Sequence, residues 1–381
     1  MKNKKPLAVY IHIPFCEKKC LYCDFLSAPA GEQARARYVE ALLCDCSLTL
    51  TKLAEEYFVT SIFLGGGTPS VLKNAQIVQI LHTVFAAIEA AEDAEVTMEV
   101  NPGTVSEDYF AALLSAGVNR ISFGLQSVNE EELHTLGRIH DYQAFERNYH
   151  AARAAGFTNI NVDLMYNLPG QTKESWKETL GRVMEKEPEH ISAYSLIIEE
   201  GTSFYSLYEE GKLCLPKEDE QDAIDEVTVQ MMKQHGYRQY EISNYAKEGY
   251  ACRHNIVYWR RGDYIGIGLG AASLLGNCRF LRTKDSAAYL LQAEKKKFEE
   301  EEKQYLSKKE AMEEYMFLGL RMCEGVSIRE FEKNFGVPMT EIYGNVLEDL
   351  RKKELLVQEG DRVYLSERGR MIGNLVFLEF V

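Results

Sequence analysis

The sequence predicts an α/β fold: a large domain of repeated strand–helix units, followed by a small α+β domain. Two observations carry this prediction. Between residues 7 and 198, six apolar runs of strand length alternate with segments whose apolar residues recur at helical spacing. After residue 300 this alternation stops, and short helical patterns precede two short strand patterns. At 381 residues, the chain is too long for one ordinary domain and fits one large unit plus a smaller one.

The six predicted strands and the helices between them follow one another closely. The strands are predicted at residues 7–13, 59–64, 95–100, 120–125, 159–164 and 190–198. The helices are predicted at 33–53, 74–91, 106–116, 142–155 and 173–186, with Ser106 as a candidate N-cap. Such units imply parallel strands with right-handed crossovers, and about 200 residues suit an open, three-quarter version of the (β/α)₈ barrel. A doubly wound sheet is the alternative, and periodicity alone does not separate the two.

The remainder of the chain follows a different pattern. A helix is expected at 219–236, and the glycine-rich, aromatic stretch 258–275 is expected to extend the sheet and close its open side. The charge-dense run 294–309 predicts a solvated helix or linker. Short helices, one starting at Ser327, and two strands around Gly360 then resemble a winged helix. The expected domains are 1–210 (barrel), 211–300 (barrel extension) and 301–381 (winged-helix-like).

Composition excludes several classes of protein. The formal net charge is −15, and acidic residues stand in the recognition stretch of the winged-helix-like domain, so nucleic acid is not an expected partner. Nine cysteines, an odd number without signs of secretion, favour a reducing cytoplasm. The basic start, residues 1–5, precedes an apolar run too short for a signal peptide, and no run approaches the roughly 20 apolar residues of a membrane span.

Three thiols lie within eight residues at the end of the first predicted strand. Cys16, Cys20 and Cys23 have the spacing CxxxCxxC, which suits zinc or an iron–sulfur cluster. Zinc fits less well because a structural zinc site closes four ligands, and Phe25 stands where a fourth might be. A [4Fe–4S] cluster held by three cysteines leaves one iron open to a small molecule's amine and carboxylate, which is the chemistry of S-adenosylmethionine (SAM) cleavage.

This loop resembles the signature of the radical SAM family, in which an aromatic residue, here Tyr22, precedes the last cysteine. The framing sequence Tyr10-Ile-His-Ile-Pro-Phe-Cys resembles the oxygen-independent coproporphyrinogen III oxidase branch of that family. The resemblance implies a partial (β/α)₆ TIM-like barrel, a [4Fe–4S] cluster on Cys16, Cys20 and Cys23, and bound SAM.

Polar and glycine residues follow the ends of the later strands, where an α/β barrel forms its site. Gly65–Gly67 could bring backbone amides close to a carboxylate, or form only a tight turn. Glu99, Gln126 and Asp163 could address polar ligand groups, or serve as salt bridges and caps. By resemblance, the SAM contacts are Tyr10, Gly66, Gly67, Glu99, Gln126, Arg138 and Asp163, with Tyr22 packed near the cofactor and Thr68 in place of an acidic residue in the glycine motif.

A second informative stretch is residues 253–259, Arg-His-Asn-Ile-Val-Tyr-Trp. His254 offers an iron ligand, Tyr258 and Trp259 offer aromatic faces, and nearby arginines offer cations for propionates. The alternative is that the aromatic residues are core and His254 caps a turn. The pattern HNxxYW resembles the heme-binding motif of heme chaperones named HemW, a group within the same branch. Phe25 supports that group, because the oxidase itself carries CxxxCxxCxC.

Two main functions follow from the resemblance. The first is a heme chaperone that binds the cluster, SAM and heme, with His254 as candidate ligand, and delivers heme to acceptor hemoproteins. The second is a coproporphyrinogen III oxidase that decarboxylates propionates by radical chemistry, with Tyr22 and Gln126 lining its chamber. A third is a radical SAM enzyme with an unrelated substrate. The implied partners are heme or a porphyrin, acceptor hemoproteins and an electron donor such as flavodoxin or ferredoxin. Peripheral membrane contact and a homodimer are compatible with these functions.

Overall fold

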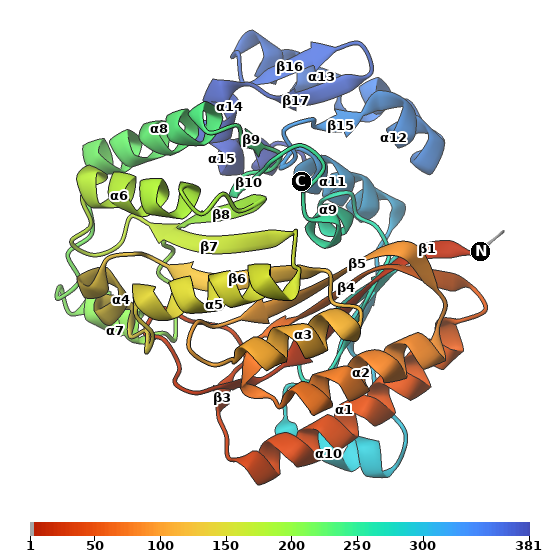
Figure 1. Ribbon diagram of the computed structural model, residues 1–381. Helices are drawn as coiled ribbons and strands as arrows, with labels where there is room; N and C mark the ends of the chain where they lie inside the picture. The colour runs from red at the N-terminus through yellow and green to blue at the C-terminus, as the bar shows by residue number, and fades with distance from the viewer. Residues whose placement is uncertain (1–3) are drawn as a thin grey trace.

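A computed structural model describes residues 4–381, so the first three residues of the basic N-terminal stretch lie outside it. Six parallel strands form the centre of one twelve-stranded sheet, in the order β1-β4-β5-β6-β7-β8 (Figure 1). Their bounds are β1 Lys5–Ile13, β4 Tyr57–Gly66, β5 Ala90–Val100, β6 Arg120–Gln126, β7 Ile160–Tyr166 and β8 His190–Ser195. The predicted strand order of an open barrel is confirmed, and a doubly wound order is not found.

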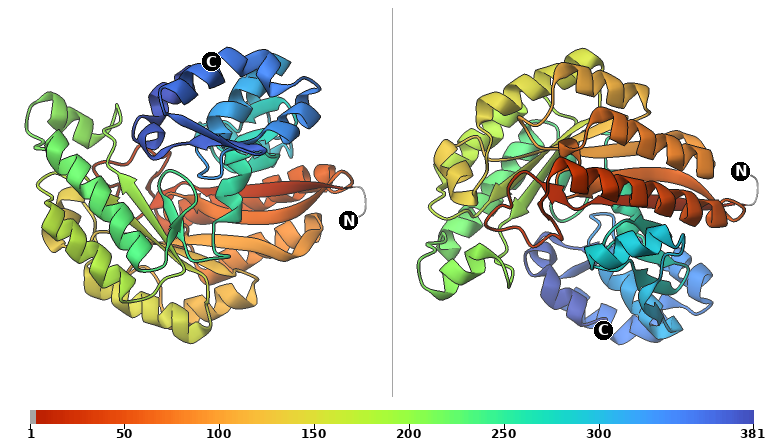
Figure 2. Two further views of the ribbon diagram at one scale, coloured as in Figure 1. Left: turned by 90° about the horizontal axis from the view of Figure 1, so that it is seen from above. Right: turned by 90° about the horizontal axis from the view of Figure 1, so that it is seen from below.

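The connecting helices lie along the outer, convex side of this curved sheet (Figures 1 and 2). They are α1 Glu32–Leu53, α2 Asn74–Ala87, α3 Glu107–Ser115, α4 Glu130–Leu136, α5 Tyr142–Ala155 and α6 Lys173–Met184. Between sheet and helices lies the main core, where large side chains such as Phe110, Phe123, Phe145 and Trp176 are fully buried. Burial of this apolar layer is the main driving force for the fold, because every crossover helix offers it one apolar face.

The sheet continues beyond both ends of the six-stranded unit. Beyond β8 come β10 Asn244–Ala246, which pairs with it, and then β9 Arg238–Gln239, which pairs with β10. Beyond β1 comes β11 Tyr264–Ile267, parallel to it. Antiparallel β12 Ala272–Leu275, β13 Cys278–Leu281 and β14 Glu301–Tyr305 complete that edge. The expected extension is therefore found, but the expected closure by sheet pairing is not, because the edge strands β9 and β14 do not pair with each other.

Several local features differ from the predictions. The third strand begins at Ala90 and not at 95, and the sixth ends at Ser195 and not at 198. The helix predicted to residue 91 ends at Ala87, because the chain turns extended to pair Ala90 with Val59 of β4. Ser106 occupies the N-cap position of α3, but its side chain makes no capping hydrogen bond. The short helices α4 and α7 (Ser203–Glu209) were not expected. The charge-dense run is neither a solvated helix nor a linker throughout, since it contains β14; charged side chains suit an exposed edge strand.

The remaining elements form the C-terminal unit and the segment that leads to it. Before it come α8 Glu218–Gln234, α9 Arg253–Trp259 and α10 Ser286–Glu294. The unit contains α11 Lys308–Gly319, β15 Val326–Ser327, α12 Ile328–Phe335, α13 Met339–Lys352, β16 Leu356–Glu359, β17 Arg362–Leu365, α14 Glu367–Met371 and α15 Gly373–Leu378. Its three strands pair as β15-β17-β16 around a separate core centred on Phe331. Ser327 caps α12, as predicted, by accepting from the amide of Glu330.

The C-terminal unit packs beside the sheet rather than on its helix-covered side (Figure 2). Helix α9 contacts both β4 and α11, so it lies between the barrel and this unit. No helix within residues 4–381 combines the length and apolar character needed to cross a membrane.

Candidate functional site

A cavity of about 380 Å³, here called the cluster cavity, opens at the C-terminal ends of the barrel strands. Eleven of the thirteen residues predicted for the site line it: Cys16, Cys20, Tyr22, Cys23, Gly66, Gly67, Thr68, Glu99, Gln126, Arg138 and Asp163. They come from the cysteine loop, the end of β4 and the turn after it, the ends of β5 and β6, the middle of β7 and the segment after α4. Residues more than 140 positions apart thus meet because parallel strands end at the same edge of the sheet.

The cysteine loop leaves β1 and returns as a short parallel pair, β2 (Phe15–Cys16) with β3 (Ala28–Pro29). Cys16 is buried, and Cys20 and Cys23 are half-buried at the cavity wall. No three ligating side chains among the described residues are close enough to share a single metal ion. A [4Fe–4S] cluster does not require this, because each thiolate binds a different iron. The soft donor set and the shared cavity therefore fit a cluster better than zinc.

The turn after β4 is tied to the cysteine loop by its backbone. The amide of Gly67 donates to the carbonyl of Ile13 at 2.8 Å, and the amide of Thr68 donates to that of Phe15 at 2.6 Å. A side chain on Gly67 would overlap the Phe15 carbonyl, and Gly66 has a φ of +113°, which L-residues rarely adopt. These glycines are therefore required for the two loops to approach each other.

Glu99 stands at the end of β5 and faces the cavity. Its Oε2 accepts from the amide of Gly66 at 3.1 Å. Burial, and secondarily the charge of Asp163, raise the pKa of Glu99 to about 8. At neutral pH, Glu99 is therefore mostly protonated until a cation reaches it. A buried carboxyl of this kind gains most from a ligand with an ammonium group.

Arg138 connects the cysteine loop to the strand ends. Its guanidinium donates to Cys20 Sγ at 3.4 Å, to Asn101 Oδ1 at 2.7 Å and to the Gly124 carbonyl. Asn101 in turn donates to Thr68 Oγ1 at 2.9 Å. A cation beside a thiolate offsets part of the negative charge that a thiolate-bound cluster carries. Gln126, at the end of β6, has a φ of +74°, a strained conformation of the kind found at ligand sites.

The other two predicted site residues, Tyr10 and His254, line a second cavity of about 220 Å³ inside the barrel, here called the interior cavity. It shares Glu99, Asp163 and Tyr194 with the cluster cavity, so the two adjoin. The HNxxYW segment forms α9 and borders this cavity through its histidine, asparagine and tyrosine. The heme-type motif and the predicted SAM contacts are therefore neighbours in space.

His254 is 1% exposed, and both of its ring nitrogens have partners. Nδ1 lies 2.9 Å from Ser61 Oγ, and Nε2 lies 2.8 Å from the hydroxyl of Tyr258. Its backbone amide donates to Glu95, which also accepts from the amide of Arg253 and so caps α9. Burial, and secondarily Arg120, lower the pKa of His254 to about 3, so the ring is neutral. The ring is thus neither a turn cap nor freely available to a metal.

The arginines near the motif already have acidic partners. Arg253 pairs with Asp93, Arg260 with Glu324 and Arg261 with Glu314. They are therefore engaged in ion pairs rather than directed at an empty space.

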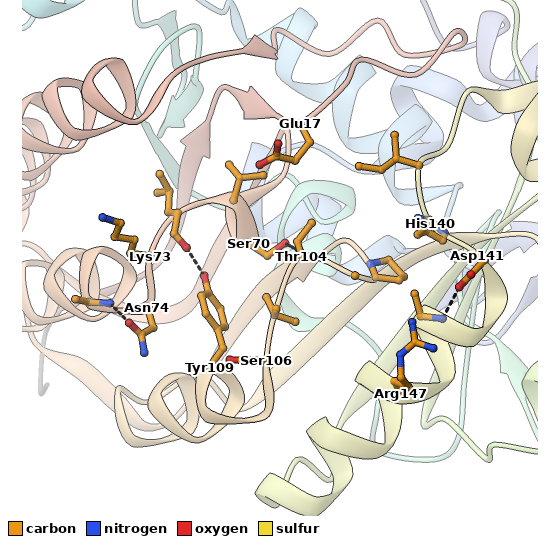
Figure 3. A pocket seen from close by; sticks show the side chains of 18 residues that line it. Glu17, Ser70, Lys73, Asn74, Thr104, Ser106, Tyr109, His140, Asp141 and Arg147 are labelled. Carbon is orange, nitrogen blue, oxygen red and sulfur yellow. Dashed lines mark hydrogen bonds between the residues drawn. The ribbon is translucent and has the colours of Figure 1, made fainter.

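A larger hollow, of about 910 Å³, lies elsewhere, on the helix side between the N-terminal ends of α2, α3 and α5 (Figure 3). Its polar groups are mainly occupied locally: Tyr109 donates to the Leu72 carbonyl, and Asp141 accepts from the amide of Ala144. None of the thirteen predicted residues lines it.

Sequence reasoning missed several residues of both cavities. Asn101 directly follows β5, so the strand-end rule could have found it. Tyr194 in β8 lines both cavities, and Arg120 and Asn161 line the interior one from the beginnings of β6 and β7. Residues at strand beginnings carry no such signal, because that end of a barrel normally serves stability.

Comparison with known proteins agrees with this geometry. The chain matches the Radical SAM superfamily over residues 10–183 and the HemN C-terminal domain over residues 306–372. It is 36% identical to heme chaperone HemW of Bacillus subtilis, over 98% of this chain and 99% of the relative. It is 47% identical to heme chaperone HemW of Escherichia coli, over 71% of each.

A solved structure of a radical SAM enzyme has the same overall fold as this chain. Coproporphyrinogen III oxidase (HemN) of Escherichia coli, a radical SAM enzyme, superposes with a TM-score of 0.86 at 25% identity, over 99% of this chain and 90% of that one. The high identity to relatives over nearly the whole length, together with the cysteine loop and strand-end residues, assigns the family: the chain belongs to the HemW family of the radical SAM superfamily.

Proposed function

We propose that this protein is a heme chaperone that holds a [4Fe–4S] cluster and SAM and delivers heme to acceptor hemoproteins. The observation that carries the proposal is the position of α9: its HNxxYW motif borders a cavity that adjoins the predicted SAM contacts. The names of relatives that match the chain over nearly its full length support the same function.

The cluster and SAM belong to the cluster cavity. Cys16, Cys20 and Cys23 would hold the cluster, which supplies an open iron and an electron source when bound. The backbone amides of Gly66 and Gly67 would bind the carboxylate of SAM, and Glu99 would bind its ammonium group. Asp163 and Gln126 would address the ribose and adenine. Arg138 orients Cys20 and neutralises charge from the protein side.

An oxygen-independent coproporphyrinogen III oxidase is the second candidate, because the chain shares its overall fold with HemN over 99% of its length. The two functions differ in turnover. Anaerobically reconstituted protein is expected to bind heme tightly and not to convert coproporphyrinogen III to protoporphyrinogen IX in multiple turnovers. Catalytic turnover without stable heme binding would replace the first proposal with the second.

The free thiols support a cytoplasmic setting for this function. All nine cysteines are unpaired, which suits a reducing compartment such as the cytoplasm. Flavodoxin or ferredoxin would be suitable electron donors for the cluster. The acidic net charge of −15 favours protein and tetrapyrrole partners over nucleic acid.

Removing the Tyr258 hydroxyl is expected to strengthen heme binding if His254 is an iron ligand. Tyr258→Phe leaves the ring in place but frees His254 Nε2 from its 2.8 Å hydrogen bond. Since such a bond contributes about 1 kcal/mol, the heme dissociation constant should fall about fivefold. Titration followed by the Soret band measures it. Tyr264→Phe, a ring that packs against Tyr258 without contacting His254, is the matched control. Unchanged binding in both variants would remove His254 from the ligand set.

SAM affinity is expected to rise with pH between 6.5 and 8.5. The pKa of Glu99 is raised to about 8, so its neutral form predominates below that value and the carboxylate above it. Only the carboxylate attracts an ammonium group, so raising the pH increases the binding-competent fraction from about 3% to about 75%, and affinity should grow about 25-fold over this interval. Equilibrium binding of SAM to cluster-loaded protein tests this. The Glu99→Gln variant should show a flat profile; an unchanged slope in it would assign the titration to another group.

A further inference from the structure

We propose that Arg120 is a carboxylate-binding residue inside the barrel and that it takes one propionate arm of the bound tetrapyrrole. This inference rests on the proposed heme-binding function and adds a recognition element to it. The observation behind it is a buried guanidinium that faces a cavity without a protein partner.

Arg120 begins β6, and its side chain lines the interior cavity. The residue is only 2% exposed. Among residues 4–381, its guanidinium forms no ion pair within 4.0 Å and no hydrogen bond, and its Nε is fully buried without a partner. A buried charge normally has an oppositely charged or hydrogen-bonding partner, because removing it from water is costly.

The two acidic side chains with the strongest influence on Arg120 are engaged elsewhere. Glu95 accepts from the amides of Arg253 and His254, at 3.1 and 3.0 Å, at the start of α9. Asp163 accepts from Ser122 at 2.8 Å and from Asn161 at 2.9 Å. Both act on Arg120 only through longer-range attraction. The thiol of Cys252 is a further neighbour that attracts the guanidinium without bonding to it. The guanidinium thus lines the cavity without a hydrogen-bonded partner among the described residues.

The remaining wall contains two carboxyl groups, of Glu99 and Asp163, and several neutral polar groups. Burial raises the pKa of both carboxyl groups, which reduces the negative charge that a propionate would meet, and both are assigned above to SAM. Ser122, Ser192, Asn255 and the hydroxyl groups of Tyr10 and Tyr258 line the same space, and each can donate or accept a hydrogen bond. A volume of about 220 Å³ is below that of pockets that enclose whole drug-sized ligands. The cavity therefore suits a carboxylate arm, not a macrocycle. A planar guanidinium can bind such a group through two parallel hydrogen bonds.

The position of the interior cavity indicates which carboxylate ligand would reach Arg120. Its wall includes residues of the HNxxYW helix on one side and residues shared with the cluster cavity on the other. A tetrapyrrole held near α9 would have propionate arms able to enter. The three arginines on the outside of the motif, Arg253, Arg260 and Arg261, are already paired with acidic side chains. Arg321, which has no ion pair among the described residues, packs over the ring of Trp259 and does not line the interior cavity. Arg120 is therefore the arginine placed to meet a carboxylate in that cavity.

The test is a thermodynamic cycle between Arg120 and the ligand's carboxylates. Heme and heme dimethyl ester, in which both propionates are neutral, are titrated into cluster-loaded wild type and Arg120→Gln. Wild type should prefer heme about tenfold, and Arg120→Gln should lose this preference by binding heme more weakly and the ester unchanged. Arg120→Lys, which keeps the charge without the planar fork, should retain part of it. Arg147→Gln removes an exposed arginine of the hollow in Figure 3 and should keep the full preference.

Each outcome has one meaning. If Arg120→Gln keeps the wild-type preference, or if wild type binds both ligands equally, the carboxylate site is overturned while the heme-binding function stands. If wild type binds neither ligand, the proposed function fails and this inference with it. Retention of the iron–sulfur absorbance shows that a variant is folded. If Arg120→Gln does not fold, the preference for heme over its dimethyl ester is compared between wild type and Arg120→Lys. An equal preference in these two proteins would overturn the carboxylate site.

Discussion

Cys16→Ala is expected to abolish cluster binding. Three thiolates are the minimum that holds a cubane with one open iron, and Cys16 is the buried one, fixed by the pairing of β2 with β3. With two thiolates left, we expect anaerobic reconstitution to yield essentially no bound iron or sulfide and no broad visible absorbance. Iron and sulfide analysis of the purified protein provides the measurement.

The control for this experiment is Cys214→Ala, which removes an exposed thiol outside the loop. It should keep the wild-type content of iron and sulfide. Full iron–sulfur absorbance in Cys16→Ala would contradict the cluster assignment. If the wild type instead contained one equivalent of zinc and no iron after anaerobic loading, the cysteine loop would be a zinc site and not a cluster site.

Gly67→Ala is expected to damage both stability and SAM binding. The added methyl group would overlap the carbonyl of Phe15, a backbone atom that cannot move without shifting the cysteine loop. We expect a loss of about 2–3 kcal/mol in the free energy of unfolding, and a melting temperature lower by roughly 5 °C. SAM affinity should fall about tenfold, because displaced amides lose at least one hydrogen bond to the ligand.

Thermal melting and equilibrium SAM binding test this substitution. Gly181→Ala is the matched control: it lies inside α6, nothing surrounds its added methyl group within 4 Å, and alanine is the better helix former. That variant should be as stable as wild type or slightly more so. If Gly67→Ala behaved like Gly181→Ala, close contact between the two loops would not be the reason for this glycine.

The sequence could place most residues of the candidate site near one another because one rule covers them. Residues at the C-terminal ends of parallel strands converge, so Glu99, Gln126 and Asp163 could be placed together from strand positions alone. Arg138 has no such position, since it follows α4, and only the family resemblance pointed to it.

What escaped prediction depends on long-range contacts. The hydrogen bond between Tyr258 and His254 lies within one helix, but the other contacts that hold His254 come from β4 and β5, 193 and 159 residues earlier. β14 could not be predicted as a strand because its residues, Glu-Glu-Lys-Gln-Tyr, are mostly charged or polar and typical of a solvent-exposed segment. Only its pairing with β13 makes it extended. The start of β5 was similarly decided by its partner strand.

The two backbone hydrogen bonds from Gly67 and Thr68 to Ile13 and Phe15 have a consequence for cofactor loading. Because these bonds join the cysteine loop to the turn after β4, a ligand that orders one of the two segments also orders the other. A bound cluster that orders the cysteine loop therefore reduces the conformational entropy that the protein loses when SAM binds, so SAM binds more tightly. By linkage, bound SAM must increase the affinity of the protein for the cluster by the same factor. The resting protein should thus lose its two cofactors together and regain them together.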